Sequence, residues 1–255
     1  SVASLYFASR VQELTLGLFS IALSIALLPT LSDLAAERDY AQMKKTLVFS
    51  FRLIFFITFP AMFGLLILNK PIIQVLFQRG VFNAQSTSMS ASCLFFFAFG
   101  LPVISGVKIL APAFYSLKDT KTPVIVAFFV MISYIVLSLI LMVPLRVGGI
   151  ALALSLASVI NFFLLFYLLE RKIGPLDKKE IFKSALKSAL GGLGMGVAVW
   201  FFIRRFDFAR LVFLRQVGIL AAAILIGMVA YLILNLLFNH QDVKSLKDLF
   251  SRPKI

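Results

Sequence analysis

Seven long apolar segments constrain this chain more than any motif in it. Each is long enough to cross about 30 Å of hydrocarbon, which takes about 20 residues of α-helix. The strands of a membrane β-barrel would be about 10 residues long, with strict alternation of apolar and polar side chains. The pattern therefore predicts an all-α polytopic membrane protein. The predicted spans are residues 4–31, 47–69, 88–115, 122–144, 147–169, 184–203 and 212–238.

The charged residues support this class and give an orientation. Only 14% of the residues are charged and 61% are hydrophobic, which is too little charge for the surface of a soluble domain. About 15 of the 25 basic residues lie in the C-terminal tail and one alternate set of loops, and about 7 lie in the other set. Basic loops tend to stay in the cytoplasm, so we expect a cytoplasmic C-terminus and an outer N-terminus. The chain lacks an initiator Met and a signal-peptide pattern, so we expect more membrane protein upstream of Ser1.

Several classes of function are disfavoured by composition. The formal charge of +14 is scattered over short loops, whereas nucleic-acid-binding proteins gather their basic residues in a stripe or domain. Cys93 and His240 are the only residues of their types, so neither an internal disulfide nor a Cys/His metal cluster is expected. No nucleophile-elbow pattern occurs, and the few carboxylates lie mostly in loops. We expect that the protein has no nucleic-acid partner, no metal, no cofactor and no enzymatic activity.

The stretch FASRVQELTLG places two charges inside the first span. Arg10 and Glu13 are three residues apart, hence neighbours on one helix face, which Gly17, Ser20 and Ser24 continue. An Arg within a span is costly, so it normally faces a bundle interior or a watery cavity and marks a pathway. The alternatives are that Arg10 pairs with Glu13 only for packing, or that it reaches the outer interface.

Two further cations lie within spans. Lys108 is 10 residues from Lys118, about 15 Å by helical rise, which is far for an interfacial anchor. It is a candidate either for a cavity or for a structural ion pair. Arg52 lies close to the cytoplasmic end of the second span, and its long side chain is expected to reach the interface.

Glycines and loops suggest local structure. Gly192 and Gly196, in GGLGMG, fit a small-xxx-small contact where another helix or a lipid chain comes close. The segment AAERDYAQMKK predicts a polar helix lying at the inner interface. PIIQVLFQRG predicts a short outer helix ended by Gly80, and Asn83 is expected to cap the following span.

Four strings carry a resemblance that runs in order over about residues 1–170. They resemble the C-terminal half of the murein lipid II flippase family (MurJ/MviN), within the multidrug/oligosaccharidyl-lipid/polysaccharide exporter superfamily. The resemblance implies the eighth to the fourteenth helices of a fourteen-helix transporter with two lobes, without its N-terminal lobe. The strings are SLYFASRVQELTLGLFSIALSIALLPTLSDLAA, PIIQVLFQRGVF, VKILAPAFYSLKDTKTPV and GGIALALSLASVINFFLL.

The resemblance implies a function and assigns residues to it. The family is held to move lipid II, the undecaprenyl-pyrophosphate-linked peptidoglycan precursor, across the bacterial inner membrane by alternating access. Arg10 in YFASR matches an arginine that lines a cationic cavity in the family's eighth helix, so the resemblance implies that Arg10 binds pyrophosphate and that Glu13 orients it. Lys108 is a weaker candidate for substrate binding, from its place within a span. Residues 1–170 would form part of the C-terminal lobe. Residues 171–255 would add two helices forming a lipid-tail groove near Gly192 and Gly196, plus a basic cytoplasmic tail.

The sequence departs from the family pattern at three positions. Ser9 replaces the Asp that usually precedes the arginine. Tyr134 and Ser138 stand where some members have the Asn and Asp of a sodium site. This argues against that sodium site and favours another energy source, such as the membrane potential. The other functions considered are an exporter of a different lipid-linked oligosaccharide or a drug, and a non-transporting membrane scaffold.

Overall fold

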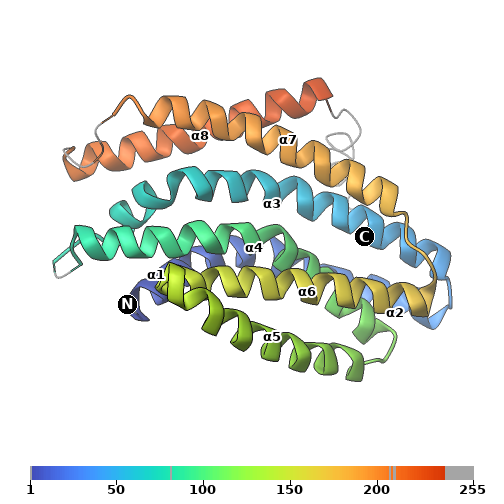
Figure 1. Cartoon of the computed structure of the whole chain (residues 1–255). Coiled ribbons are helices and arrows are strands. Elements are labelled where there is room, and N and C mark those ends of the chain that lie inside the picture. Colours follow the sequence, from blue (N-terminus) through green and yellow to red (C-terminus); the bar gives the residue numbers. More distant parts are fainter. Residues whose placement is uncertain (1, 81, 207, 209–210, 239–255) are drawn as a thin grey trace.

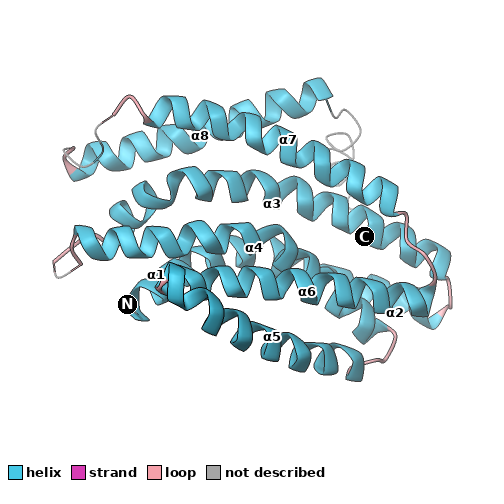
Figure 2. Cartoon of the chain, in the orientation of Figure 1, coloured by secondary structure: helices cyan, strands magenta, loops and turns pink. Residues whose placement is uncertain are grey.

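The computed structural model describes residues 2–80, 82–206, 208 and 211–238. These residues form helices joined by short connections, and Figure 2 shows no strand among them. Seven of the helices, with α1, η1 and α2 counted as one, are long and apolar enough to cross a membrane. The predicted all-α class and its seven spans are confirmed for the described residues. The elements are α1 (Val2–Leu16), the π-helical turn η1 (Gly17–Ile21), α2 (Ala22–Ala36), α3 (Tyr40–Phe77), α4 (Ala84–Ser116), α5 (Lys121–Leu145), α6 (Val147–Ile173), α7 (Lys178–Ile203) and α8 (Phe213–Phe238).

Helix α3 is longer than its predicted span, and both short interfacial helices predicted beside it are wrong. Before α3 a tight turn replaces the polar helix, with Arg38 at φ 57° and Asp39 Oδ1 accepting a hydrogen bond from the Gln42 amide at 2.9 Å. At its C-terminal end α3 continues to Phe77 instead of ending before a separate helix. Ile73 and Val75 are buried against neighbouring helices. This packing extends the helix beyond the apolar span.

The start of α4 confirms a predicted cap. Asn83 Oδ1 accepts a hydrogen bond from the Ser86 amide at 3.0 Å and satisfies one of the free N–H groups of the first turn. Gly80 adopts φ 57° in the preceding connection, the left-handed region that glycine enters without a steric penalty. The α3–α4 connection is therefore short and well defined on both sides of residue 81, which is not described.

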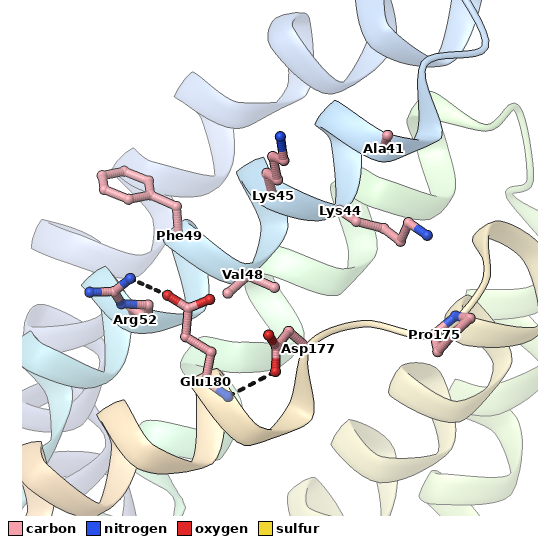
Figure 3. A pocket seen from close by; sticks show the side chains of 9 residues that line it. All are labelled: Ala41, Lys44, Lys45, Val48, Phe49, Arg52, Pro175, Asp177 and Glu180. Atoms are coloured by element: carbon pink, nitrogen blue, oxygen red, sulfur yellow. Dashed lines mark hydrogen bonds and ion pairs between the residues drawn. The ribbon is translucent and has the colours of Figure 1, made fainter.

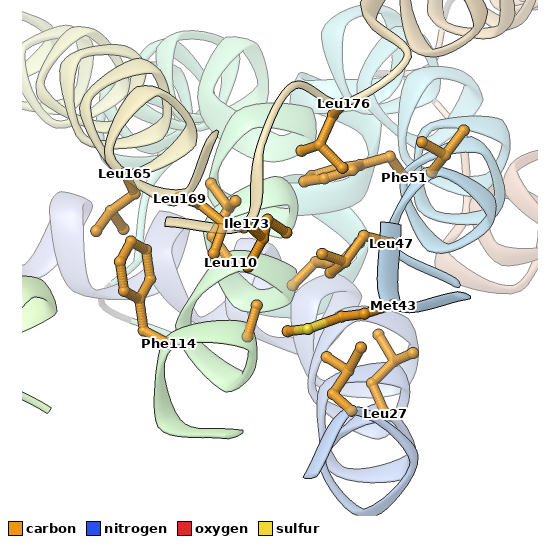
Figure 4. Packing of buried hydrophobic residues seen from close by; sticks show 14 of the residues in the cluster. Leu27, Met43, Leu47, Phe51, Leu110, Phe114, Leu165, Leu169, Ile173 and Leu176 are labelled. Atoms are coloured by element: carbon orange, nitrogen blue, oxygen red, sulfur yellow. The ribbon is translucent and has the colours of Figure 1, made fainter. Parts of the chain in front are cut away.

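Helix α4 is the most buried helix of the bundle, and α5 is the least buried. Helices α1 and α2 pack on α4, which also contacts α3 and α6, while α5 packs mainly on α6. In Figure 1, α3 lies between the α4 and α6 layer and the α7–α8 pair. A buried cluster at one end of the bundle joins α2, α3, α4 and α6 (Figure 4). Its fully buried large side chains include Leu47, Phe51, Leu110, Phe114 and Leu169.

Ion pairs tie the short connections together at the same end of the bundle. Lys172 Nζ lies 2.6 Å from Asp119 Oδ2, joining α6 to the α4–α5 connection. Lys178 Nζ lies 2.7 Å from Glu170 Oε2, joining α7 to the end of α6. Burial alone would raise the pKa of the Asp119 carboxyl, but hydrogen bonds from Lys172 and Thr122 outweigh burial and hold that pKa well below its usual range. Asp119 is therefore a carboxylate at neutral pH.

The α7–α8 pair is attached to the rest of the bundle through α3. Helix α7 runs along α3, and α8 packs on α7 and on α3. The Tyr231 hydroxyl donates a hydrogen bond to the Phe56 carbonyl at 2.7 Å. The division at residue 170 into a lobe and an added pair of helices stays a prediction. The tail after Phe238, including His240, lies outside the described residues.

Candidate functional site

Arg10 and Glu13 form an ion pair on α1. Arg10 Nη1 lies 2.8 Å from Glu13 Oε2, and the Arg10 guanidinium lies 4.7 Å from the centre of the Tyr6 ring. Both charged side chains remain 55% exposed. The prediction that the two residues are neighbours on one helix face is therefore confirmed. Tyr6 also contacts Arg10, which the sequence analysis did not predict.

A buried glutamine fixes the direction in which Arg10 points. Gln12 Nε2 donates a hydrogen bond to the Phe97 carbonyl of α4 at 3.0 Å, and Gln12 is only 4% exposed. Two residues of α-helix turn the side chain by about 200°, so Arg10 lies on the opposite side of α1 from Gln12. Arg10 consequently points away from α4 and out of this bundle. Sequence reasoning missed Gln12, although a polar residue within an apolar span is the signal for such a contact.

The surroundings of Arg10 differ from those of a lipid-facing helix. Helix α5 also has most of its surface exposed, but no charged residue lies between Lys121 and Arg146. Its exposed side chains, such as Val124 and Phe128, suit a hydrocarbon environment. The exposed side of α1 instead carries a charged pair, which is costly against lipid. Exposed apolar side chains such as Leu14 lie on α1 as well, so the feature that distinguishes α1 from α5 is the charged pair.

The predicted polar face of α1 is interrupted at Ser20. The Ser20 Oγ lies 2.7 Å from the Ser105 Oγ of α4, and Ser20 is buried. The π-helical turn η1 causes this difference, because it accommodates more residues per turn than an α-helix and rotates the side chains that follow. Gly17 has no neighbouring atom within 4 Å of the position a Cβ would take. Ser20 is therefore a packing contact, while Arg10, Glu13 and Gly17 share an open side with exposed apolar residues such as Leu14. Ser24 is partly buried, and its place on the polar face stays a prediction.

Lys108 is exposed on α4 but does not lie near Arg10. The contacts Gln12–Phe97 and Ser20–Ser105 both join residues 85 apart, so the two helices run parallel. Arg10 is therefore roughly level with Phe95, and Lys108 lies about 13 residues further along, about 20 Å at 1.5 Å per residue. Among the described residues Lys108 makes no ion pair, so the structural ion pair considered for it is not found there.

Arg52 lies toward the end of the bundle that carries the α2–α3, α4–α5 and α6–α7 connections, called the basic end below. Its partner there is on another helix, and its predicted reach to the membrane interface stays a prediction. Its guanidinium pairs with the Glu180 carboxylate in the first turn of α7. The Arg52 side chain is only 19% exposed. This pair joins α3 to α7 across 128 residues of sequence, and Arg52 is best described as a link between helices.

The glycines of α7 are packing positions. A Cβ on Gly192 would lie 2.7 Å from the Phe63 ring, and one on Gly196 would lie 2.8 Å from Ile67 Cδ1, both on α3. Gly191 and Gly194 face α8 instead. At Gly192 and Gly196 the close neighbour is a helix and not a lipid chain. The two glycines are buried and do not line an open groove, which corrects their assignment to a lipid-tail groove, while a groove elsewhere on α7 and α8 stays a prediction.

The two positions aligned with a sodium site lie one turn apart on α5. Tyr134 and Ser138 are both partly buried, and the Ser138 Oγ is buried without a hydrogen-bond partner among the described residues. Helix α5 contains neither a carboxylate nor a carboxamide. No group of three or more His, Cys, Asp or Glu side chains in the described part of the chain could hold a metal ion.

Comparison with known proteins matches this chain to one family. The family model described as lipid II flippase MurJ matches residues 1–218. A probable lipid II flippase MurJ from Bdellovibrio bacteriovorus is 36% identical over 199 residues, which cover 78% of this chain and 38% of that protein. Another from Rhizobium tropici is 30% identical over 257 residues, which cover 100% of this chain and 48% of that protein.

A solved structure agrees with the sequence matches. The structure of a lipid II flippase MurJ in an inward closed conformation superposes with a TM-score of 0.77 and 28% sequence identity. The superposition covers 95% of this chain and 48% of that chain. The chain thus spans less than half the length of the relatives it matches.

Proposed function

This chain belongs to the lipid II flippase MurJ family, and we propose that it forms one lobe of a transporter that moves lipid II across a bacterial inner membrane. The cycle proposed is alternating access between this lobe and a second, N-terminal lobe. In this proposal the protein is a flippase and not an enzyme, it serves peptidoglycan synthesis, and the C-terminal tail lies in the cytoplasm.

The observation that carries the proposal is the placement of Arg10. The residue lies on an apolar span, half-exposed, on the side of α1 that faces away from the bundle. A guanidinium offers paired donors and a permanent charge, which match the two phosphates of a pyrophosphate. Arg10 would therefore contact the lipid II headgroup in the space between the two lobes. Glu13 and Tyr6 would hold its side chain in position.

Lys108 has a secondary place in this proposal. About 20 Å separate it from Arg10 along the helix axis, so one pyrophosphate does not contact both at once. Lys108 is exposed on α4 and nearer the basic end of the bundle. It would meet the headgroup at a different stage of its passage.

The energy source proposed is not a sodium site of the family type. Tyr134 and Ser138 supply only hydroxyl groups on a helix without carboxylates or carboxamides. A hard cation is held by several oxygen ligands, among which a carboxylate contributes a full negative charge. The membrane potential, or a monovalent ion bound elsewhere, would drive the cycle.

The proposal is tested with the full-length gene in cells depleted of their own lipid II flippase. We expect the gene to restore growth and cell shape, and to restore lipid II on the outer leaflet to at least half its normal level. Exposed lipid II is measured by its accessibility to a reagent added from outside. A second measurement compares binding of lipid II and of another lipid-linked oligosaccharide to the purified full-length protein.

The two other functions predict different results. An exporter of another lipid-linked oligosaccharide or a drug would not restore lipid II exposure, and the purified protein would bind its own substrate more tightly than lipid II. A scaffold would leave exposure unrestored and bind neither lipid. Either result, obtained with protein at normal membrane abundance, would overturn the proposed flippase function.

A further inference from the structure

A second polar site lies at the basic end of the bundle, away from Arg10. It is a pocket of about 530 Å³ between α3 and α7 (Figure 3). Lys44, Lys45 and Arg52 of α3 line it together with Glu180 of α7. Arg10 lies on α1, which packs on α4, so this pocket is separate from the site proposed for the transported lipid.

The charge inside the pocket is not balanced. Glu180 is paired with Arg52, and Asp177 Oδ1 accepts a hydrogen bond from the Glu180 amide at 3.1 Å (Figure 3). The hydrogen bond leaves the negative charge of Asp177 in place, so three cations and two carboxylates give the lining of the pocket a net charge of +1. Lys44 and Lys45 form no ion pair with any residue of the described ranges. The excess positive charge of the pocket therefore lies on these two ammonium groups, and it attracts an anion from outside the chain.

The polar and apolar groups of the pocket occur in a definite order along α3. Lys44 and Lys45 lie within two turns of the start of the helix, and Val48 and Phe49 follow one turn further on. The lysines therefore lie at the end of the membrane span, and the apolar wall lies deeper in it. A soluble anion would contact only the lysines. A phospholipid would contact the lysines with its phosphate, and Val48 and Phe49 with its first acyl carbons.

We propose that this pocket binds the phosphodiester headgroup of an anionic phospholipid from the surrounding leaflet. Lys44 and Lys45 bind the phosphate, and the Arg52–Glu180 pair closes the deep end of the pocket. Because the pair joins α3 to α7, a bound lipid contacts both helices and holds the α7–α8 pair against α3. The proposal does not depend on which substrate the transporter carries.

The test uses purified full-length protein in detergent, titrated with phosphatidylglycerol while native mass spectrometry counts the bound lipids. Each lysine near an anionic headgroup contributes about fivefold in affinity. We therefore expect the double variant Lys44→Gln, Lys45→Gln to lower the affinity for the first bound phosphatidylglycerol by about tenfold or more. Phosphatidylcholine, which carries no net charge, is expected to bind both proteins equally.

A matched control removes the same charge from the same end of the bundle. Lys118 and Lys121 are exposed, flank the α4–α5 connection and do not line the pocket. The variant Lys118→Gln, Lys121→Gln is expected to change the first binding constant by less than twofold. An equal loss in both double variants would overturn the site, because it would show only diffuse attraction to a basic surface.

Two competitors distinguish the sources of the phosphate group. Inorganic phosphate at millimolar concentration is expected not to displace phosphatidylglycerol, and displacement would assign the pocket to a soluble anion. Lipid II is expected not to compete either. Competition by lipid II that is lost in the Lys44→Gln, Lys45→Gln variant would make the pocket part of the transport path and contradict the proposal.

Discussion

Replacing Arg10 with Ala in the full-length protein is expected to lower lipid II exposure on the outer leaflet by about 10- to 100-fold while membrane abundance stays normal. A hydrogen bond to a charged group contributes about 1.5–3 kcal/mol, which corresponds to that range of rate or affinity. The side chain is half-exposed and packs on no buried cluster, so its loss is not expected to unfold the bundle. The measurement is the accessibility of lipid II in flippase-depleted cells that carry the variant gene.

The variant Arg10→Lys separates charge from geometry. A lysine keeps the positive charge but lacks the planar pair of donors that matches a phosphate, so it is expected to restore little activity. Leu14→Ala is the control, because Leu14 is exposed on the same helix and carries no charge. Wild-type exposure of lipid II in both Arg10 variants would make Arg10 a structural residue. A collapse in abundance of the variants would favour the scaffold function.

The second large effect concerns the tight connection between α5 and α6. A Cβ on Gly149 would overlap the carbonyl group of Leu141 and lie 2.9 Å from the Met142 backbone nitrogen. The clash is with backbone and not with a flexible side chain, so α6 must move relative to α5. Arg146 already adopts φ 50° in the same connection, which leaves little room for adjustment. We expect Gly149→Ala to destabilise the protein by about 3 kcal/mol.

The change is measured as the thermal unfolding temperature of the purified full-length protein. A loss of about 3 kcal/mol in a domain of this size lowers Tm by about 6–12 °C. Gly218→Ala is the matched control, since a Cβ on Gly218 has no neighbouring atom within 4 Å. It is expected to leave Tm unchanged or to raise it slightly, because Ala favours the helix. Equal Tm values for Gly149→Ala and wild type would contradict the packing described for α5 and α6.

Local patterns predicted much of the fold. The seven spans follow from apolar length alone, and the Asn83 cap follows from a residue type with one physical role at that position. The length of α3 could not be predicted from apolar length or residue type. Its C-terminal end is helical because Ile73 and Val75 are buried by other helices, which a single-helix pattern does not reveal.

The candidate site was predicted only in part, because local spacing can be read from the sequence and long-range contacts cannot. The adjacency of Arg10 and Glu13 needs only helical spacing, and the structure bears it out. The inward rotation of Ser20 depends on a π-helical turn, which no residue type in the sequence predicts. The pocket at Lys44 and Lys45 exists because α7 meets α3, as the Arg52–Glu180 pair shows across 128 residues. Sequence spacing does not give such long-range contacts.

The most direct test of the central claim, that lipid II passes along the Arg10 side of α1, is a photocrosslink. An aromatic photoreactive amino acid replaces Tyr6, which lies beside Arg10 and is exposed, so the arginine itself is kept. The control places the same group at Phe128, on the apolar exposed side of α5. With the full-length protein in membranes containing labelled lipid II, the account predicts a lipid II adduct at position 6 and none at position 128. Adducts of equal yield at both positions, or none at position 6, would contradict it.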